Sequence, residues 1–402
     1  MSKPILSIII PTKNGVDTID YAIRSCLEIK DTRNEVEVII QDCSTDNETQ
    51  SLVEKKYKNT NVKYFKSEGA PSMNENWEYA IINSTGKFIC GIGDDDAVLP
   101  NILDLARWAY NNEITTIYQP MVNYIWKGAY LGTYSSGKIA FSEKTSKLSF
   151  MGAEEVLQCR KMVIKKCGFE YNSKLPNIYH GIVRADLIEM VFNKTGHRLG
   201  GTSLDVYSAI TLAELTEKHA ITPCAFSIRG ASFKSNTNRI VLKKENEHYS
   251  ELKEYKKNPL LPSKLMSADI SVTETCIDAL NEIARPEIIY TMDFSFLYGR
   301  CIALNLKLAL PLFNEYKVKV GGDFYSILKQ SIKYYRMYAK VKLIETLFYY
   351  LELISPSVAS WLYRKLSNGV IKIEASDILI AAKYYCNSNV YLKNKISSYE
   401  FF

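Results

Sequence analysis

Three consecutive aspartates are the residues of this sequence best suited to chemistry. Asp94, Asp95 and Asp96 follow the apolar segment 88–92. Adjacent carboxylates repel one another, and a divalent cation such as Mg²⁺ or Mn²⁺, which prefers oxygen ligands, relieves that repulsion. Along an extended segment Asp94 and Asp96 would point the same way, and Asp95 would point away from them. The alternative is a solvated acidic turn that caps a helix expected to open at Pro100, because carboxylates favour a helix N-terminus.

Small, polar or acidic residues also follow the three preceding strand-like segments. They form the stretches 11–15, 42–46 and 67–70. In an open α/β sheet, ligands bind outside the carboxyl ends of the strands. The four loops together therefore predict a crevice for a polar ligand, in which Asp42 would accept a hydrogen bond from a base or a ribose. Asp42 could equally be a turn or helix-capping aspartate, which is a common role.

The elements that position these loops alternate between strands and helices. Short β-branched runs predict strands over five segments, residues 6–10, 36–40, 62–65, 88–92 and 115–122. Helical patterns lie between them, so the sequence predicts an α/β fold with a mostly parallel sheet flanked by helices. A hairpin-like pattern follows over 124–141, and helices resume near Ala153.

Composition changes further along the chain predict its division into parts. Residues 236–262 are polar and lysine-rich and contain two prolines, which is typical of a linker. We therefore expect an α/β domain over 1–235, a linker over 236–262 and a mainly helical C-terminal region over 263–402.

The loop segments together resemble a known enzyme family. The stretches 7–14, 41–46 and 93–96, in this order and spacing, are similar to the motifs of glycosyltransferase family 2, whose fold is the Rossmann-like GT-A type. The resemblance covers residues 4–235, so it implies that 1–235 is the nucleotide-sugar-binding and catalytic domain. The helical region 263–402 would then serve acceptor, membrane-surface or oligomer contacts. It implies an inverting hexosyl- or N-acetylhexosaminyl-transferase of the bacterial surface-polysaccharide type. Such an enzyme takes a nucleoside-diphosphate sugar, most often a UDP-sugar, uses Mn²⁺ or Mg²⁺, and acts on a glycan or lipid-linked glycan in O-antigen or capsule-like biosynthesis.

The resemblance also implies roles for particular residues. The nucleotide-sugar site would comprise Pro11, Thr12, Asn14, Asp42, Ser44, Gly69, Asn76, Asp94 and Asp95. Within that set, Asp42 would contact uracil and Asp94 would lie near the ribose. Asp96, together with Asp94, would bind the metal, although the triple run leaves the register of the motif open by one residue. The arginine usual in the segment after Gly69 is missing, which leaves the donor sugar contacts undefined.

A carboxylate well downstream of the metal motif serves as catalytic base in this family. Asp205 lies in that region and opens the apolar segment 206–213. We predict that Asp205 takes the proton from the acceptor hydroxyl. A helix N-cap is the alternative, and one residue could fill both roles.

Other enzyme classes lack their motifs here. The sequence contains no GxGxxG fingerprint after its first strand, no P-loop, no GxSxG elbow and no HExxH spacing. Among the four histidines, only His180 attracts attention, because it lies between two element-like segments. The remaining alternatives are a nucleotidyltransferase on the same architecture and a non-catalytic nucleotide- or sugar-binding module. The first would need a triphosphate loop that 12–17 does not supply.

Charge and cysteine usage bear on partners and location. The net charge of +6 favours an anionic partner but is too small and too dispersed to predict nucleic-acid binding. Nine irregularly spaced cysteines indicate reduced thiols, and no apolar run is long enough to span a membrane, so we expect a cytoplasmic protein. Lysines and an arginine at helical spacing over 326–341, followed by an apolar stripe over 343–354, favour either a position on the inner, anionic membrane surface or packing in a bundle or homo-oligomer.

Overall fold

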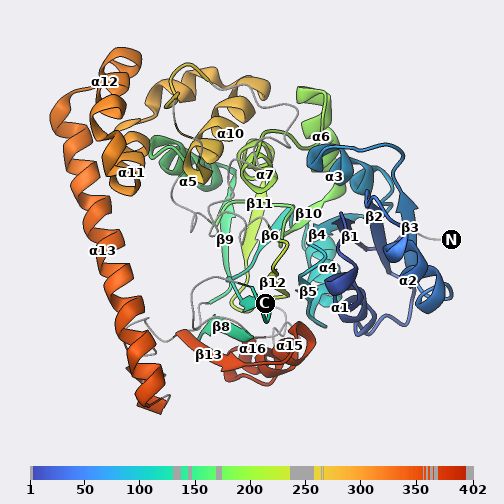
Figure 1. The fold of residues 1–402 in the computed structure, drawn as a ribbon. Helices are drawn as coiled ribbons and strands as arrows, with labels where there is room; N and C mark the ends of the chain where they lie inside the picture. The colour runs from blue at the N-terminus through green and yellow to red at the C-terminus, as the bar shows by residue number, and fades with distance from the viewer. Residues whose placement is uncertain are drawn as a thin grey trace.

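The computed structural model describes most of the chain. The described residues are 3–129, 137–143, 147–168, 174–235, 258–263, 265, 267–355, 357–358, 361–362, 365 and 370–394. Most of the expected linker 236–262 lies outside them. Figure 1 shows an α/β part on one side of the molecule and a group of helices above it, from which one long helix runs down the outer edge.

A large mixed sheet forms the centre of the α/β part. Within the described residues it has eight strands in the order β3-β2-β1-β4-β10-β6-β11-β9. Their bounds are β1 Leu6–Thr12, β2 Val36–Asp42, β3 Val62–Lys66, β4 Phe88–Gly91, β6 Thr116–Tyr118, β9 Ser149–Gly152, β10 Ile182–Arg184 and β11 Lys218–Ile221. The first four strands pair in parallel, whereas β10 runs antiparallel to both of its neighbours. The carboxyl ends of β1, β2 and β3 therefore lie at one edge, as the sequence predicts.

Helices cover both faces of this sheet, as predicted. They are α1 Val16–Leu27, α2 Glu48–Lys56, α3 Met73–Ile82, α4 Ile102–Asn111, α5 Ala153–Lys165, α6 Ala185–Thr195 and α7 Leu204–Ala213. Alternate residues of β1 join different cores, because successive side chains of a strand point to opposite faces. Ile8 and Ile10 pack in the core that includes α1 and α4, and Ile9 packs in the core that includes α5 and α7.

A smaller sheet lies beside the large one. Its described strands are β5 Ala97–Val98, β7 Asn123–Ile125, β8 Lys138–Ser142, β12 Ser227–Ala231 and β13 Val370–Glu374, in the order β13-β8-β7-β12-β5. The antiparallel pairing of β7 with β8 confirms the predicted hairpin pattern. The sequence does not predict β13, which comes from the far end of the chain and pairs antiparallel with β8.

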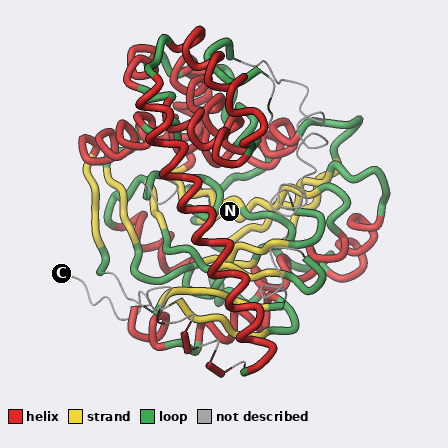
Figure 2. The backbone as a smooth tube through the Cα atoms, turned by 60° about the vertical axis from the view of Figure 1, so that its left-hand side comes forward, coloured by secondary structure: helices red, strands yellow, loops and turns green. Residues whose placement is uncertain are grey.

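The C-terminal part is mainly helical, as expected. Its elements are α10 Ala268–Glu282, η1 Pro286–Thr291, α11 Ser295–Leu304, η2 Leu306–Leu308, α12 Ala309–Val320, α13 Phe324–Ile354, α15 Ile378–Cys386 and α16 Asn389–Asn394. Helix α10 packs against α7, and α15 packs against the smaller sheet. No helix in the described part of the chain combines the length and the apolar character needed to cross a membrane. Figure 2 shows α13 running in front of the rest of the molecule.

Two local expectations are wrong. Pro100 does not open α4, because that helix begins at Ile102 with Asn101 in the N-cap position. The segment 93–96 is a turn and not an extended stretch, since the amide of Asp96 bonds back to the carbonyl of Gly93. The alternation that would point Asp94 and Asp96 the same way therefore does not apply.

Candidate active site

The loop after β1 and the acidic turn after β4 touch directly. The Thr12 hydroxyl donates a hydrogen bond to Oδ2 of Asp94. The absence of a side chain at Gly15 permits this close approach, because a Cβ there would lie 1.9 Å from Oδ2 of Asp94. Lys234 approaches from a later loop and donates to the Asn14 carbonyl at 3.0 Å. Asp94 is half-buried, so it is the most accessible carboxylate of the turn.

Asp95 and Asp96 are buried beneath Asp94 and are held by strand β12 and its flanks. The amide of Ser232 donates to Oδ2 of Asp95 at 2.8 Å. Asp96 accepts from the amides of Gly230 and Gly93, each at 2.6 Å. These contacts fix the shape of the turn and leave Asp94 facing the β1 loop.

His180 connects the acidic turn to a chain of buried side chains. Its Nε2 lies 3.0 Å from Oδ2 of Asp96, and its Nδ1 lies 2.7 Å from the Ser227 hydroxyl. Gln119 donates to that hydroxyl and accepts the amides of Phe226 and Ser227, which fixes the direction of its own amide group. The chain therefore holds His180, and through it Asp96, in one orientation.

The three carboxyls have different pKa values because their surroundings differ. Burial raises the pKa of Asp94 to about 6, while the Thr12 hydrogen bond opposes that rise. Burial, followed by the charges of Asp96 and Asp94, raises the pKa of Asp95 well above its usual value. Burial also acts on Asp96, but His180 and the backbone amides outweigh it and lower its pKa. Burial and the neighbouring carboxylates thus make negative charge on Asp94 and Asp95 unfavourable in this turn.

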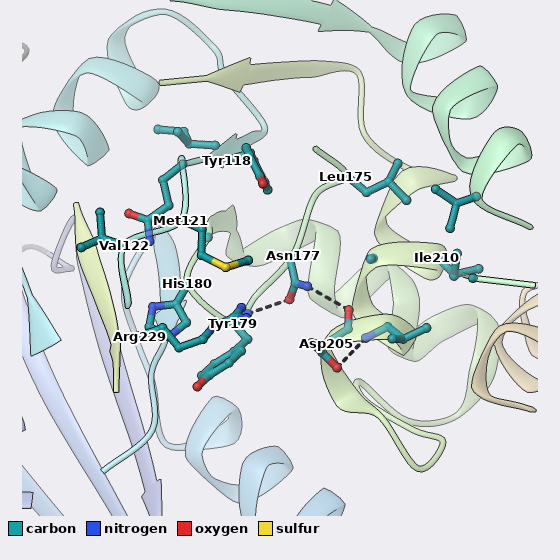
Figure 3. A pocket seen from close by; sticks show the side chains of 17 residues that line it. Tyr118, Met121, Val122, Leu175, Asn177, Tyr179, His180, Asp205, Ile210 and Arg229 are labelled. Atoms are coloured by element: carbon teal, nitrogen blue, oxygen red, sulfur yellow. Dashed lines mark hydrogen bonds between the residues drawn. The ribbon is translucent and has the colours of Figure 1, made fainter. Parts of the chain in front are cut away.

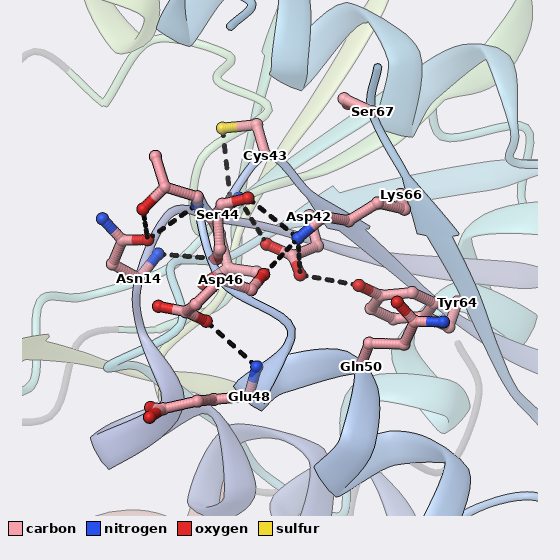
Figure 4. Close-up of polar contacts among 12 residues, drawn as sticks. Asn14, Asp42, Cys43, Ser44, Asp46, Glu48, Gln50, Tyr64, Lys66 and Ser67 are labelled. Carbon is pink, nitrogen blue, oxygen red and sulfur yellow. Dashed lines mark hydrogen bonds and ion pairs between the residues drawn. The ribbon is translucent and has the colours of Figure 1, made fainter. Parts of the chain in front are cut away.

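Asp42 lies in a second polar network, at the end of β2 (Figure 4). Its side chain is fully buried. Oδ1 accepts the amide of Ser44 at 2.7 Å, and Oδ2 accepts the Tyr64 hydroxyl at 2.7 Å and lies 3.3 Å from Nζ of Lys66. Lys66 also donates to the carbonyls of Ser44 and Asp46. In this arrangement Asp42 shapes the loop after β2, and its direct contact with uracil stays a prediction.

The loops after β1 and β2 are joined to each other. The Asn14 amide donates to the Ser44 hydroxyl at 2.7 Å, and Oδ1 of Asn14 accepts from Thr45. Asn14 has a φ of 57°, a left-handed conformation that asparagine tolerates better than most residues. The structure thus brings together Asn14 and Ser44, two residues that the sequence assigns to one nucleotide site.

The other predicted nucleotide-site residues take different places. Pro11 is buried at the end of β1. Asn76 is buried too, and its amide nitrogen lies 3.3 Å from the carbonyls of Thr12 and Gln41, so it ties the ends of β1 and β2. Gly69 is exposed, with a φ of +73° and open space around it. Asn76 thus positions the ends of β1 and β2, whereas Gly69 leaves open space beside the loop after β3.

Asp205 lines a pocket on the other side of His180 (Figure 3). It lies in the first turn of α7, where Ser203 and not Asp205 occupies the N-cap position. Its backbone carbonyl accepts a hydrogen bond from the Asn177 side chain at 2.9 Å. Tyr179 and Arg229 line the same pocket, with the Arg229 guanidinium 5.3 Å from the centre of the Tyr179 ring.

Sequence reasoning missed how this pocket is assembled. His180 attracts attention only by its position between elements, and Arg229 belongs to no sequence motif. Asn177 and Tyr179 carry no recognisable signal. Gly91 pairs with Tyr179 in an isolated bridge, and this tertiary contact carries the segment 177–180 to the end of β4.

Comparison with known proteins bears on the β1, β2 and β4 loops. Residues 7–151 match the model of glycosyl transferase family 2. The predicted resemblance to this family is therefore confirmed over residues 7–151, which are about a third of the chain. The match spans the elements from β1 to β9, including the joined loops and the acidic turn. His180, Asp205 and Arg229 lie beyond it.

Other comparisons add little to this glycosyltransferase assignment. No curated protein sequence matches the chain. TarS of S. aureus, residues 1–349 in complex with UDP-GlcNAc, is 15% identical over 79% of this chain and 93% of that chain, with a TM-score of 0.45. The mannosyltransferase PcManGT of Pyrobaculum calidifontis, in complex with GDP-Man and Mn²⁺, is 12% identical over 83% of this chain and 88% of that one, with a TM-score of 0.39. Likenesses this distant carry no argument about ligands.

The glycosyltransferase family implies a divalent cation, and the acidic turn can be tested for it. Within the described residues, no three acidic, histidine or cysteine side chains form a complete metal cluster. A Mg²⁺ or Mn²⁺ that is held by one or two carboxylates and completed by diphosphate oxygens and water does not need such a cluster. Asp94 fits that role because it is half-buried, and a cation would offset the burial and the neighbouring carboxylate charge that raise the pKa values of Asp94 and Asp95.

Proposed function

We propose that this protein is an inverting glycosyltransferase. It would move a sugar from a nucleoside-diphosphate sugar, with a UDP-sugar as the expected donor, to a hydroxyl of a glycan or lipid-linked glycan in polysaccharide biosynthesis. One observation carries the proposal beyond the family match. His180 lines the pocket of Asp205 and also lies 3.0 Å from Asp96 in the acidic turn. His180 thus lies between the candidate base and the candidate diphosphate-binding loop.

The donor would bind along the joined loops after β1 and β2. Thr12 contacts Asp94 and Asn14 contacts Ser44, and Asp94 is the most accessible carboxylate of the turn, which supports its proposed contact with a diphosphate and its cation. A bound cation would supply charge stabilisation for the leaving diphosphate. We assign Asp96 a supporting part in metal binding, because His180 and two amides already occupy its oxygens.

The acceptor would enter the Asp205 pocket. Asp205 would take the proton from the acceptor hydroxyl, whose oxygen would form a bond to the anomeric carbon while the bond from that carbon to the diphosphate oxygen breaks. The nucleoside diphosphate would leave, and a donor with an α linkage would give a β-linked product. The guanidinium of Arg229, which lines the same pocket as Asp205, would attract an anionic group of the donor or of the acceptor.

The substitution Asp205→Asn tests this assignment. Turnover of a UDP-sugar panel, measured as release of UDP, should fall by about 10²- to 10⁴-fold, because the amide cannot accept the proton. Donor affinity should change little. Asp186→Asn is the matched control, since Asp186 also lies in the first turn of a helix but is exposed on α6. Full turnover by Asp205→Asn would refute Asp205 as base, and a wild-type protein that binds UDP but never releases it from any sugar would favour the non-catalytic module.

A further inference from the structure

Helix α13 is only partly covered by the rest of the protein. Its 31 residues correspond to a rod about 46 Å long. Ile327, Ser331 and Tyr334 are buried in its first half, where it packs against α11. Figures 1 and 2 show that the helix then continues along the outside of the molecule, with no other described element in front of it.

An apolar stripe runs along the uncovered side of α13. Its large members are between 39% and 81% exposed and are Leu328, Ile332, Tyr335, Leu343, Leu347, Tyr350 and Ile354. At about 100° per residue these side chains fall within a sector of about 120°, turned away from the buried side. Scattered apolar residues are normal on protein surfaces, but seven exposed large side chains on one side of a single helix mark an interaction surface. We call these seven residues the α13 stripe.

A row of positive charges borders the stripe. Lys329, Lys333 and Lys340 lie along one border at helical spacing, Arg336 lies just inside that border, and Lys342 lies on the other. All five side chains are exposed. The sequence contains no aspartate or glutamate between residues 324 and 344. Within the described part of the chain, no ion pair involves any of the five, and the Nζ of Lys333 lies 5.6 Å from the ring centroids of Phe296 and Tyr334.

Charge complementarity selects the partner. A second copy of the chain docked stripe to stripe with its helix parallel would bring two rows of like charges together, which is unfavourable. An anionic bilayer would accept the apolar stripe among its headgroups and attract the bordering lysines and arginine. We propose that α13 binds in the plane of an anionic membrane surface. The proposal goes beyond the sugar transfer itself and would bring the Asp205 pocket to the same surface as a lipid-linked acceptor.

Vesicle flotation of the full chain tests the proposal. The protein should float with vesicles of phosphatidylglycerol and phosphatidylcholine, should not float with pure phosphatidylcholine, and should be released by raised salt because exposed charges are screened. The variant Lys329→Glu/Lys340→Glu should lower the partition coefficient by about tenfold or more, since each near-surface cation contributes substantially. Lys55→Glu/Lys58→Glu makes the same charge change at exposed positions in and just after α2 and should float like the wild type.

A second variant separates docking from general attraction of charge. Leu343→Ser/Leu347→Ser removes exposed apolar side chains without changing charge and should also weaken flotation by several-fold. Equal flotation of this variant and the wild type would overturn insertion of the stripe, as would wild-type flotation that ignores lipid charge or no flotation at all. A dimer in sedimentation equilibrium that the same variant abolishes would assign the stripe to a second copy instead. Turnover on a soluble acceptor is independent of all these outcomes, so failure here leaves the proposed transferase activity standing.

Discussion

At the scale of single residues, the three adjacent aspartates differ in their contacts and in their burial. Asp96 is fixed by His180 and two amides, Asp95 by the amide of Ser232, and Asp94 by the Thr12 hydroxyl. Only Asp94 keeps substantial exposure. The chemistry of the turn therefore depends on how closely the β1 loop approaches Asp94.

The substitution Gly15→Ala tests that approach. The new Cβ would lie 1.9 Å from Oδ2 of Asp94 and 2.6 Å from the Thr12 hydroxyl oxygen, so the carboxylate must shift. We expect stability to fall by about 1–3 kcal/mol and the Mn²⁺-dependent affinity for UDP to fall by at least about tenfold. Titration calorimetry measures the affinity, and urea unfolding measures the stability.

A matched glycine supplies the control for that experiment. Gly152 is exposed and has nothing within 4 Å of an added Cβ, so Gly152→Ala should leave UDP affinity unchanged. If Gly15→Ala bound UDP and Mn²⁺ like the wild type, Asp94 would not belong to the donor site.

Sequence predicts part of this residue scale. Thr12 and Asn14 end up beside Asp94 and Ser44 because the carboxyl ends of parallel strands share an edge. The burial of Asp42 under Lys66 is not predictable, since nothing in the sequence tells which loop lysine will fold over it. His180 reaches Asp96 through a tertiary pairing that has no local signal.

At the scale of elements, apolar runs predict β1, β2 and β4 well because each is a buried strand of a parallel sheet. Strand β10, which runs antiparallel to its neighbours, and strand β13, near the end of the chain, are not predicted from the sequence. Strand β13 finds its partner β8 more than two hundred residues earlier in the chain, and pairing partners depend on tertiary packing and not on local pattern. Helix α15 follows β13 back onto the smaller sheet, where Tyr385 is buried.

Tyr385 tests whether this return stabilises the catalytic part. Its hydroxyl accepts the amide of Ala225 at 2.8 Å, and Tyr385→Phe would leave that buried amide without this acceptor. We expect a loss of about 1–3 kcal/mol in the free energy of unfolding. The neighbouring Tyr384 is exposed, so Tyr384→Phe should change stability by less than about 0.5 kcal/mol. Equal urea midpoints for the two variants would contradict the contact.

At the scale of the whole molecule, the site joins two parts with different sequence signals. The joined loops and the acidic turn lie within the residues that match the family, whereas the Asp205 pocket is built from later segments. Helix α10 packs against α7, and hydrogen bonds join Ser271 and Thr275 of α10 to the segment 202–203 just before α7. The helical part thus positions the helix that carries Asp205, in addition to carrying α13 on its outer side.

The central claim is that the acidic turn and the joined loops form a metal-dependent nucleotide site. Thermal unfolding with UDP, GDP, dTDP and CMP, each with and without Mn²⁺, tests it most directly in the wild type and in Asp94→Asn. A nucleotide at about 100 times its dissociation constant should add roughly 2.7 kcal/mol, which raises the melting temperature by several degrees. We predict that UDP with Mn²⁺ stabilises the wild type and that Asp94→Asn loses the metal-dependent part. Stabilisation by none of the four nucleotides, with or without Mn²⁺, would contradict the account.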